Sequence, residues 1–205
     1  MKKVTEIIFA TGNAGKMDEI REIMQDFPVR IRSMKEAGVA VDAEENGTTF
    51  EENALIKAKA VAEKLGPKEG VLVLADDSGL VVDALGGEPG IYSARYMGRD
   101  TTYAEKNANI IQRLEGVPVE KRTARFVCAV AAASADGTEF VVTGTIEGKI
   151  GYEERGEHGF GYDPIFYLPD MSMTTAELPP EEKNAISHRG RALELMKQRL
   201  AAEYL

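Results

Sequence analysis

Two adjacent carboxylates, Asp76 and Asp77, follow an apolar run at residues 71–75 and precede Ser78 and Gly79. The run predicts a buried strand that ends at Asp76. Successive side chains of a strand point to opposite faces, so we expect the two aspartates to occupy different environments. Ligands bind at such strand ends in α/β proteins, and carboxylates suit Mg²⁺. A solvated turn uses the same residue types and is an open alternative.

A glycine-bearing loop at residues 11–16 joins a predicted strand, 5–10, to a predicted helix that begins near Met17. This arrangement directs backbone N–H groups and a helix N-terminus at an anion, and Lys16 adds a charge suited to phosphate. The loop is not a Walker A motif, because its glycine spacing is short and Met17 replaces Ser/Thr. An ordinary strand-to-helix turn is the alternative. The loop residues are Thr11, Gly12, Asn13, Ala14, Gly15 and Lys16.

A second predicted helix, 50–65, follows the acidic segment 41–47, which contains Glu45. Thr49 and Glu52 have the spacing of a capping box at its start. Asn53 and Lys57 lie one turn apart on its polar side and could both reach a cleft. A solvated helix face is the alternative interpretation.

Two later segments carry groups that could recognise a base. Glycines flank Phe160 in residues 159–164, so a ligand could approach the backbone while the ring stacks on it. A turn with a buried aromatic residue is the alternative. Near the C-terminus, Lys183, His188 and Arg189 bring three donors into a short span, although a lone histidine is usually structural.

Taken together, six segments resemble the inosine triphosphate pyrophosphatase family, whose members hydrolyse non-canonical purine nucleoside triphosphates. They occur in the expected order over almost the whole chain. The matching residues are 11–16 (TGNAGK), 49–54 (TFEENA), 75–80 (ADDSGL), 85–95 (LGGEPGIYSAR), 159–164 (GFGYDP) and 182–189 (EKNAISHR).

The resemblance implies hydrolysis of ITP, dITP and XTP at the α–β phosphoanhydride with Mg²⁺ as cofactor. It implies that Asp77 is the general base and a metal ligand, that Glu45 is a second metal ligand, and that Asp76 supports the site. It also implies substrate contacts from residues 11–16, Lys57, Ser78, Phe160, Gly161, Tyr162, Asp163, Lys183, His188 and Arg189.

The purine preference has a physical rationale. ITP and XTP carry an acceptor oxygen at C6 where ATP carries an amino donor, so donors in the pocket would lose their partners with ATP. Two other functions stay open: a pyrophosphatase for pyrimidine or other modified nucleotides, and a nucleotide-binding module without turnover.

The elements that must position these residues alternate between helix and strand early in the chain and end in a hairpin. The hairpin is predicted at Asp136-Gly137, between 122–133 and 138–146, and another helix is predicted after a cap at Asp100 or Thr101. This order predicts an α/β fold with a mixed sheet. The resemblance implies one domain, 1–205, as a long mixed β-sheet with flanking helices forming two lobes around a central cleft.

Composition restricts the partners. The net charge of −9 argues against nucleic acid and an anionic membrane as partners. The one cysteine, Cys128, excludes an internal disulfide and favours a reducing compartment, where we expect it as a small buried hydrophobe. Without a signal peptide or a membrane-spanning run, we expect a cytoplasmic protein, and the resemblance implies a homodimer.

Overall fold

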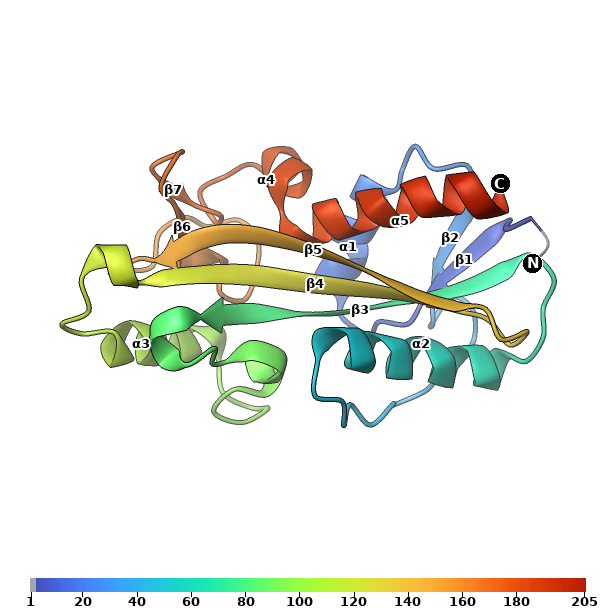
Figure 1. Cartoon of the computed structure of the whole chain (residues 1–205), viewed down its shortest axis with the longest axis horizontal. Helices are drawn as coiled ribbons and strands as arrows, with labels where there is room; N and C mark the ends of the chain where they lie inside the picture. Colours follow the sequence, from blue (N-terminus) through green and yellow to red (C-terminus); the bar gives the residue numbers. More distant parts are fainter. Residues whose placement is uncertain (1–2) are drawn as a thin grey trace. The chain divides into compact units, whose positions relative to one another are not determined.

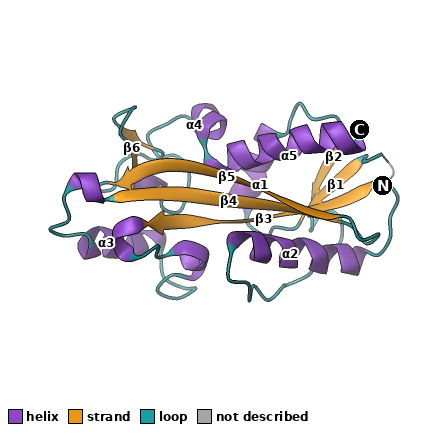
Figure 2. Ribbon diagram, in the orientation of Figure 1, coloured by secondary structure: helices purple, strands orange, loops and turns teal. Residues whose placement is uncertain are grey.

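The computed structural model describes residues 3–205, in which seven strands form one sheet of order β2-β1-β3-β4-β5-β6-β7 (Figures 1 and 2). β1 pairs in parallel with β2 and β3, whereas β5, β6 and β7 pair antiparallel, so the sheet is mixed as predicted. The strands are β1 (Glu6–Phe9), β2 (Arg30–Ser33), β3 (Val71–Val82), β4 (Thr123–Ala133), β5 (Glu139–Ile150), β6 (Phe166–Leu168) and β7 (Met173–Thr174).

Five α-helices accompany these strands in the described part of the chain. They are α1 (Ala14–Ile23), α2 (Phe50–Leu65), α3 (Tyr103–Arg113), α4 (Pro180–Ile186) and α5 (His188–Tyr204). The chain divides into two compact units. The first unit comprises Met1–Asp77, Cys128–Gly144 and His188–Leu205, and the second comprises Ser78–Val127 and Thr145–Ser187.

In the first unit, alternate residues of β3 pack into two separate apolar clusters. Leu72 and Leu74 pack with residues of α1 and α5, whereas Val73 and Ala75 pack with residues of α2. The period of two along a strand therefore places helices on both faces of this part of the sheet (Figure 1). At Gly144 an added Cβ would lie 2.4 Å from the His188 carbonyl oxygen, so glycine lets the start of α5 lie directly on β5.

β3 is longer than predicted. It was expected to end at Asp76, but it continues through both aspartates to Val82, because Leu80 and Val82 are fully buried and extend the apolar pattern. The Leu80 amide, which lies beyond the expected end, donates to Ser93 Oγ at 2.9 Å. The alternative of a solvated turn at residues 76–79 is therefore wrong.

The second unit has its own apolar core beneath α3, where the rings of Phe126 and Phe166 lie 4.4 Å apart. The cap of α3 differs from the prediction of Asp100 or Thr101. Thr102 caps the helix, and its side chain and that of Glu105 form a reciprocal capping box. The capping box decides the boundary, because only Thr102 has a glutamate three residues later.

The predicted hairpin is confirmed between β4 and β5, where the Ser134 amide donates to the Thr138 carbonyl at 3.0 Å. Cys128 is fully buried in β4, as expected for a small apolar residue. Within residues 3–205, no helix combines the length and the apolar character that crossing a bilayer requires.

Candidate active site

Asp76 and Asp77 contact different groups in the first unit, as their adjacent positions in a strand predict. Asp76 Oδ2 lies 2.9 Å from Lys16 Nζ and 3.2 Å from Arg189 Nη2. Asp77 Oδ1 lies 3.5 Å from Lys57 Nζ. Both carboxylates are buried, and each one is paired with at least one cation from a helix.

The Asp76 cluster is a buried ion network. Burial would raise the pKa of Asp76, but the charges of Lys16 and Arg189 outweigh it and hold the pKa well below its usual range. The Arg189 guanidinium also forms an ion pair with Glu19 of α1 and is 2% exposed. Asp76 thus stays ionised and holds the first turns of α1 and α5 against β3.

The Lys57 cluster joins two separated carboxylates. Lys57 Nζ lies 3.2 Å from Glu45 Oε2 as well as 3.5 Å from Asp77 Oδ1. Burial raises the pKa of Asp77 despite the nearby lysines. Burial would lower the pKa of Lys57, but Asp77, Asp76 and Glu45 together raise it. This lysine therefore stays protonated between acids that would otherwise repel each other.

Glu45 and Asp77 fit a divalent cation with oxygen ligands. Asp77 Oδ2 is buried and has no hydrogen-bond partner within residues 3–205. No cluster of three or more acidic, histidine or cysteine side chains suited to a metal occurs in that described range. Mg²⁺ binds through one or two carboxylates and completes its shell with water and substrate phosphates, so two carboxylates are sufficient.

The loop at residues 11–16 has the geometry of a helix cap. Asn13 Oδ1 accepts the Lys16 amide at 3.1 Å, and Thr11 Oγ1 accepts the Asn13 amide at 3.2 Å. An added Cβ at Gly12 would meet nothing within 4 Å, so the backbone here borders open space. The start of α1 and the Lys16 ammonium thus lie in one segment of the first unit, which suits an anion.

In the second unit, Lys183 and Asp163 hold Phe160. Lys183 Nζ lies 2.6 Å from Asp163 Oδ2 and 5.2 Å from the centroid of the Phe160 ring. The Phe160 amide donates to the same Asp163 oxygen at 2.9 Å, and Thr175 Oγ1 donates to Asp163 Oδ1 at 2.8 Å. The Asp163 carboxylate therefore positions the ring and the lysine through both of its oxygens.

The next residues anchor this loop to the unit. Tyr162 is 4% exposed and its hydroxyl donates to the Ser93 carbonyl at 2.7 Å. The Gly161 carbonyl accepts from Asn107 Nδ2 at 3.3 Å. At Gly159, φ is +73° and an added Cβ would lie 2.2 Å from Asp163 Oδ2, so only glycine fits. Tyr162 is thus a buried anchor, while Phe160 stays partly exposed.

The predicted site residues therefore form two groups, one in each unit. The first unit brings together Glu45, Lys57 and Asp77, and next to them Lys16, Asp76 and Arg189. The second unit brings together Phe160, Asp163 and Lys183. His188 is buried at the start of α5, and Ser78 is half-buried in β3. The substrate contacts assigned to Ser78, His188 and Arg189 stay predictions.

Sequence reasoning missed three residues that position these groups, namely Glu19, Asn107 and Thr175. Glu19 had a weak signal, because it lies three residues after Lys16 and thus on the same helix face. Asn107 and Thr175 had none, since their partners are distant in the sequence.

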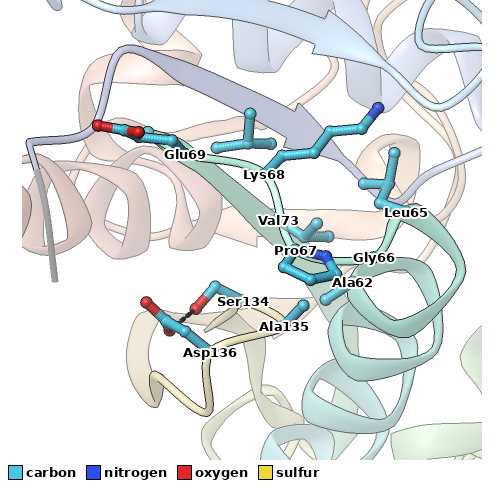
Figure 3. A pocket seen from close by; sticks show the side chains of 12 residues that line it. Ala62, Leu65, Gly66, Pro67, Lys68, Glu69, Val73, Ser134, Ala135 and Asp136 are labelled. Atoms are coloured by element: carbon cyan, nitrogen blue, oxygen red, sulfur yellow. Dashed lines mark hydrogen bonds between the residues drawn. The ribbon is translucent and has the colours of Figure 1, made fainter.

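A hollow of about 550 Å³ lies elsewhere in the first unit, beside the end of α2 and the β4–β5 hairpin (Figure 3). None of the predicted site residues lines it. Its charged side chains, Lys68, Glu69 and Asp136, are all exposed, and Asp136 hydrogen-bonds Ser134 next to it. The hollow therefore lacks the buried charge that the two clusters above have.

Comparison with known proteins identifies relatives over the whole length. The model of the Ham1 family matches residues 7–199. A dITP/XTP pyrophosphatase of Geobacillus kaustophilus is 50% identical over 188 residues, which cover 92% of this chain and 90% of the relative. A dITP/XTP pyrophosphatase of Bacillus cereus is 42% identical over 207 residues, covering 100% and 99% of the two chains.

Solved structures agree with these sequence matches. The Ham1 protein of Staphylococcus aureus superposes with a TM-score of 0.85 at 41% identity, covering 97% of this chain and 100% of that one. A nucleoside-triphosphatase / dITP/XTP pyrophosphatase of Mycobacterium abscessus gives 0.74 at 40% identity, covering 94% and 98%. Sequence and fold thus confirm the resemblance, and the chain belongs to the Ham1 family.

Proposed function

We propose that this protein hydrolyses ITP, dITP and XTP at the α–β phosphoanhydride, releasing the nucleoside monophosphate and pyrophosphate. The observation that carries the proposal is the meeting of Glu45 and Asp77, 32 positions apart in the sequence, at the Lys57 ammonium. Relatives at 42–50% identity that are named dITP/XTP pyrophosphatases support the choice of substrate. Such an enzyme would remove deaminated purines from the nucleotide pool.

The first unit would bind the triphosphate. Residues 11–16, with Lys16 and the start of α1, provide donors and positive charge for the phosphate oxygens, and Lys57 adds a further ammonium. Glu45 and Asp77 would hold Mg²⁺, which when bound neutralises phosphate charge and acidifies or orients water. Catalysis then depends mainly on positioning and on charge stabilisation.

Asp77 would accept the proton of the attacking water at Oδ2, the oxygen that has no partner within residues 3–205. Burial raises the pKa of this carboxyl, which makes it a better proton acceptor than an exposed aspartate. Asp76 is held ionised by Lys16 and Arg189 and is a supporting residue in the same strand.

The second unit would check the purine. Phe160 offers a partly exposed ring for stacking, and Lys183 is a donor fixed beside it by Asp163. A donor in the pocket can hydrogen-bond to the 6-oxo group of ITP or XTP. When ATP is bound, the same donor faces the 6-amino group, which is also a donor, and loses its partner. One unpaired buried polar group costs about 1–3 kcal/mol, so two such losses would give discrimination of about a hundredfold or more. We assign backbone groups of Gly161, Tyr162 and Asp163 to the same base edge.

Measuring pyrophosphate release from ITP, XTP, dITP, ATP, GTP and the pyrimidine triphosphates, with and without Mg²⁺, tests the proposal. We expect fast release from the first three in the presence of Mg²⁺ only. Preferred hydrolysis of a pyrimidine nucleotide would contradict the purine assignment. Binding of all three without pyrophosphate release would instead identify a binding module.

The base-reading role of Lys183 has its own test. Lys183→Ala removes the donor that lies 5.2 Å from the Phe160 ring centroid, so we expect the ITP-to-ATP ratio of kcat/KM to fall about tenfold or more. The ratio, unlike absolute activity, does not change when a variant is merely less stable. An unchanged ratio would remove Lys183 from base recognition.

The proposal also includes a cytoplasmic homodimer with no nucleic-acid or membrane partner. The net charge of −9 supports the absence of anionic macromolecular partners. Light scattering of the purified protein at micromolar concentration tests the dimer, for which we expect twice the chain mass of 22.3 kDa.

A further inference from the structure

The segment that carries Glu45 has no regular secondary structure, because residues 40–47 form neither helix nor strand. Its position therefore depends on individual contacts. Three come from the beginning of α2: Asn53 Oδ1 accepts the Gly47 amide at 2.9 Å, Glu52 Oε2 accepts the Thr48 amide at 2.6 Å, and Lys57 Nζ donates to Glu45 Oε2 at 3.2 Å. One helix thus contacts the segment at Glu45 and Gly47, and also contacts Thr48, the residue after it.

The contact between Asn53 and Gly47 is the more buried of the two backbone contacts, since it is partly buried and the contact between Thr48 and Glu52 is exposed. Asn53 is fully buried, whereas Glu52 is exposed. The orientation of the Asn53 amide is fixed, because the Gly47 N–H needs an acceptor and Nδ2 is a donor. The bond is therefore less open to competing water than the exposed bond from Thr48 to Glu52, which makes it the more effective constraint on the segment.

The glycine at position 47 is needed for this approach. An added Cβ would lie 2.7 Å from Asn53 Oδ1 and 2.8 Å from Glu52 Cβ. Gly47 is absent from the positive-φ residues of the described chain, so its backbone conformation is open to other residues. Glycine is therefore needed at this position because of the close packing against Asn53. The backbone dihedral angles do not require it.

The spacing on α2 connects this clamp with the carboxylates. Asn53 and Lys57 are four residues apart and share one helix face. Asn53 holds the backbone two residues after Glu45, and Lys57 holds the carboxylates of Glu45 and Asp77. The same face thus fixes both the segment and the side chain that the segment presents.

We propose that Asn53 is a positioning residue for the divalent cation: by clamping the Gly47 amide it keeps the Glu45 carboxylate in reach of Asp77. The inference rests on the metal site of the proposed function and deepens it. Asn53 itself touches neither cation nor substrate. Residues that orient metal ligands typically change metal affinity tenfold to a hundredfold when they are replaced.

The test compares four variants with the wild-type protein. Asn53→Ala removes the acceptor, Gly47→Ala displaces the same contact from the other side, and a double variant combines them. Thr49→Ala is the matched control, because Thr49 caps α2 at the Glu52 amide and does not contact Gly47 or Asn53 through its side chain in any described hydrogen bond. It lowers helix stability by about 1 kcal/mol while leaving the clamp in place.

Two readouts are used on the full chain. The first is Mn²⁺ binding to the metal-free protein, followed by electron paramagnetic resonance without nucleotide. The second is the Mg²⁺ concentration for half-maximal ITP hydrolysis, compared with kcat at saturating Mg²⁺. We expect both Asn53→Ala and Gly47→Ala to weaken Mn²⁺ binding about tenfold to a hundredfold and to raise the Mg²⁺ requirement, with kcat at saturating Mg²⁺ reduced much less.

The double variant distinguishes a clamp from two independent defects. If both residues act through one contact, the double variant loses no more Mn²⁺ affinity than the single variant that has the larger loss. Wild-type Mn²⁺ affinity in Asn53→Ala, additive losses in the double variant, or an equal loss in Thr49→Ala would overturn the inference. A wild-type protein that binds no Mn²⁺ and hydrolyses ITP without Mg²⁺ would instead refute the metal site of the proposed function.

Discussion

Asp76 and Asp77 are neighbours in one strand, and their surroundings change the pKa of the two carboxyls in opposite directions. Lys16 and Arg189 lower the pKa of Asp76 against the effect of burial, whereas burial raises the pKa of Asp77. Ionised Asp76 thus stabilises the folded chain, whereas the ionisation of Asp77 lowers the free energy of unfolding. Opposite pKa shifts in adjacent acids are a recurring way to separate a structural from a chemical role.

For Asp77 we predict a gain in stability together with a loss of activity. Asp77→Asn removes the proton acceptor and a proposed metal ligand, so turnover of ITP should fall about 10²–10⁴-fold. Because a raised pKa means that ionisation at neutral pH opposes folding, the neutral asparagine should raise Tm at pH 7. Calorimetry and pyrophosphate release measure the two effects.

The control for this prediction is Asp83→Asn, which removes an exposed carboxylate that pairs with Arg125. We expect little change in Tm or activity there, since exposed ion pairs contribute at most about 1 kcal/mol. Near-normal turnover in Asp77→Asn would contradict its role as the base.

For Asp76 we predict the opposite effect on stability, and it should depend on pH. Its ionised form stabilises the fold at any pH above the ordinary carboxyl pKa of about 4, and this contribution is lost as the pH falls below that value. Asp76→Asn should therefore lower the free energy of unfolding by about 3 kcal/mol at pH 7, as for other broken buried pairs. The difference from wild type should shrink progressively below pH 4.

Denaturant titrations of both proteins between pH 2 and pH 7 measure this difference. A gap of constant size over that range would mean that Asp76 contributes through packing, not through its charge.

At the level of single elements, the sequence predicts which helices and strands exist better than it predicts where each one ends. The sequence predicts β1, α1 and α2 within a few residues of their bounds, whereas it gives no prediction for the short strands β6 and β7. The apolar run predicts only the part of β3 that precedes Asp76, because carboxylates in a strand usually mark its end. Here cations from α1, α2 and α5 surround those carboxylates, and no local pattern announces that.

In the candidate site, too, the sequence predicts residues within local motifs but not the contacts between residues that are distant in the chain. Side chains next to recognisable motifs, such as Lys57 and Lys183, were found. Their partners across the chain, such as Asn107 for the Gly161 carbonyl, were not. Hydrogen bonds that span tens of residues depend on the finished fold, so the motifs identified the groups and the fold determined their pairing.

The start of α3 gives a test at this scale. Thr102→Ala should destabilise the protein by about 1 kcal/mol, because Thr102 Oγ1 accepts the Glu105 amide and its own amide donates to Glu105. Asp100→Ala, at the cap that the sequence favoured, should change the free energy of unfolding by less than about 0.5 kcal/mol. Chemical denaturation of both variants decides between the two caps, and equal losses would speak against Thr102 as the cap.

For the whole molecule, the strands β3, β4 and β5 each contribute residues to both compact units. Unfolding either unit therefore disrupts strands of the other, and we expect the chain to unfold in one cooperative step. Cys128 offers a way to measure this, because it is the one cysteine of the sequence and is fully buried in the first unit. Burial, with the charge of Asp76 next in importance, raises the pKa of its thiol to about 12.

The Cys128 thiolate must attack a disulfide reagent and displace its leaving thiolate, so at pH 8 the native protein should react only through an opening that exposes β4. With reclosing faster than labelling, the observed rate gives the free energy of that opening. We predict that this value equals the free energy of unfolding from far-ultraviolet circular dichroism, within about 1 kcal/mol. The rate for the protein in denaturant provides the reference for a fully exposed thiol. A labelling free energy several kcal/mol below the global value would mean that the first unit opens separately from the second.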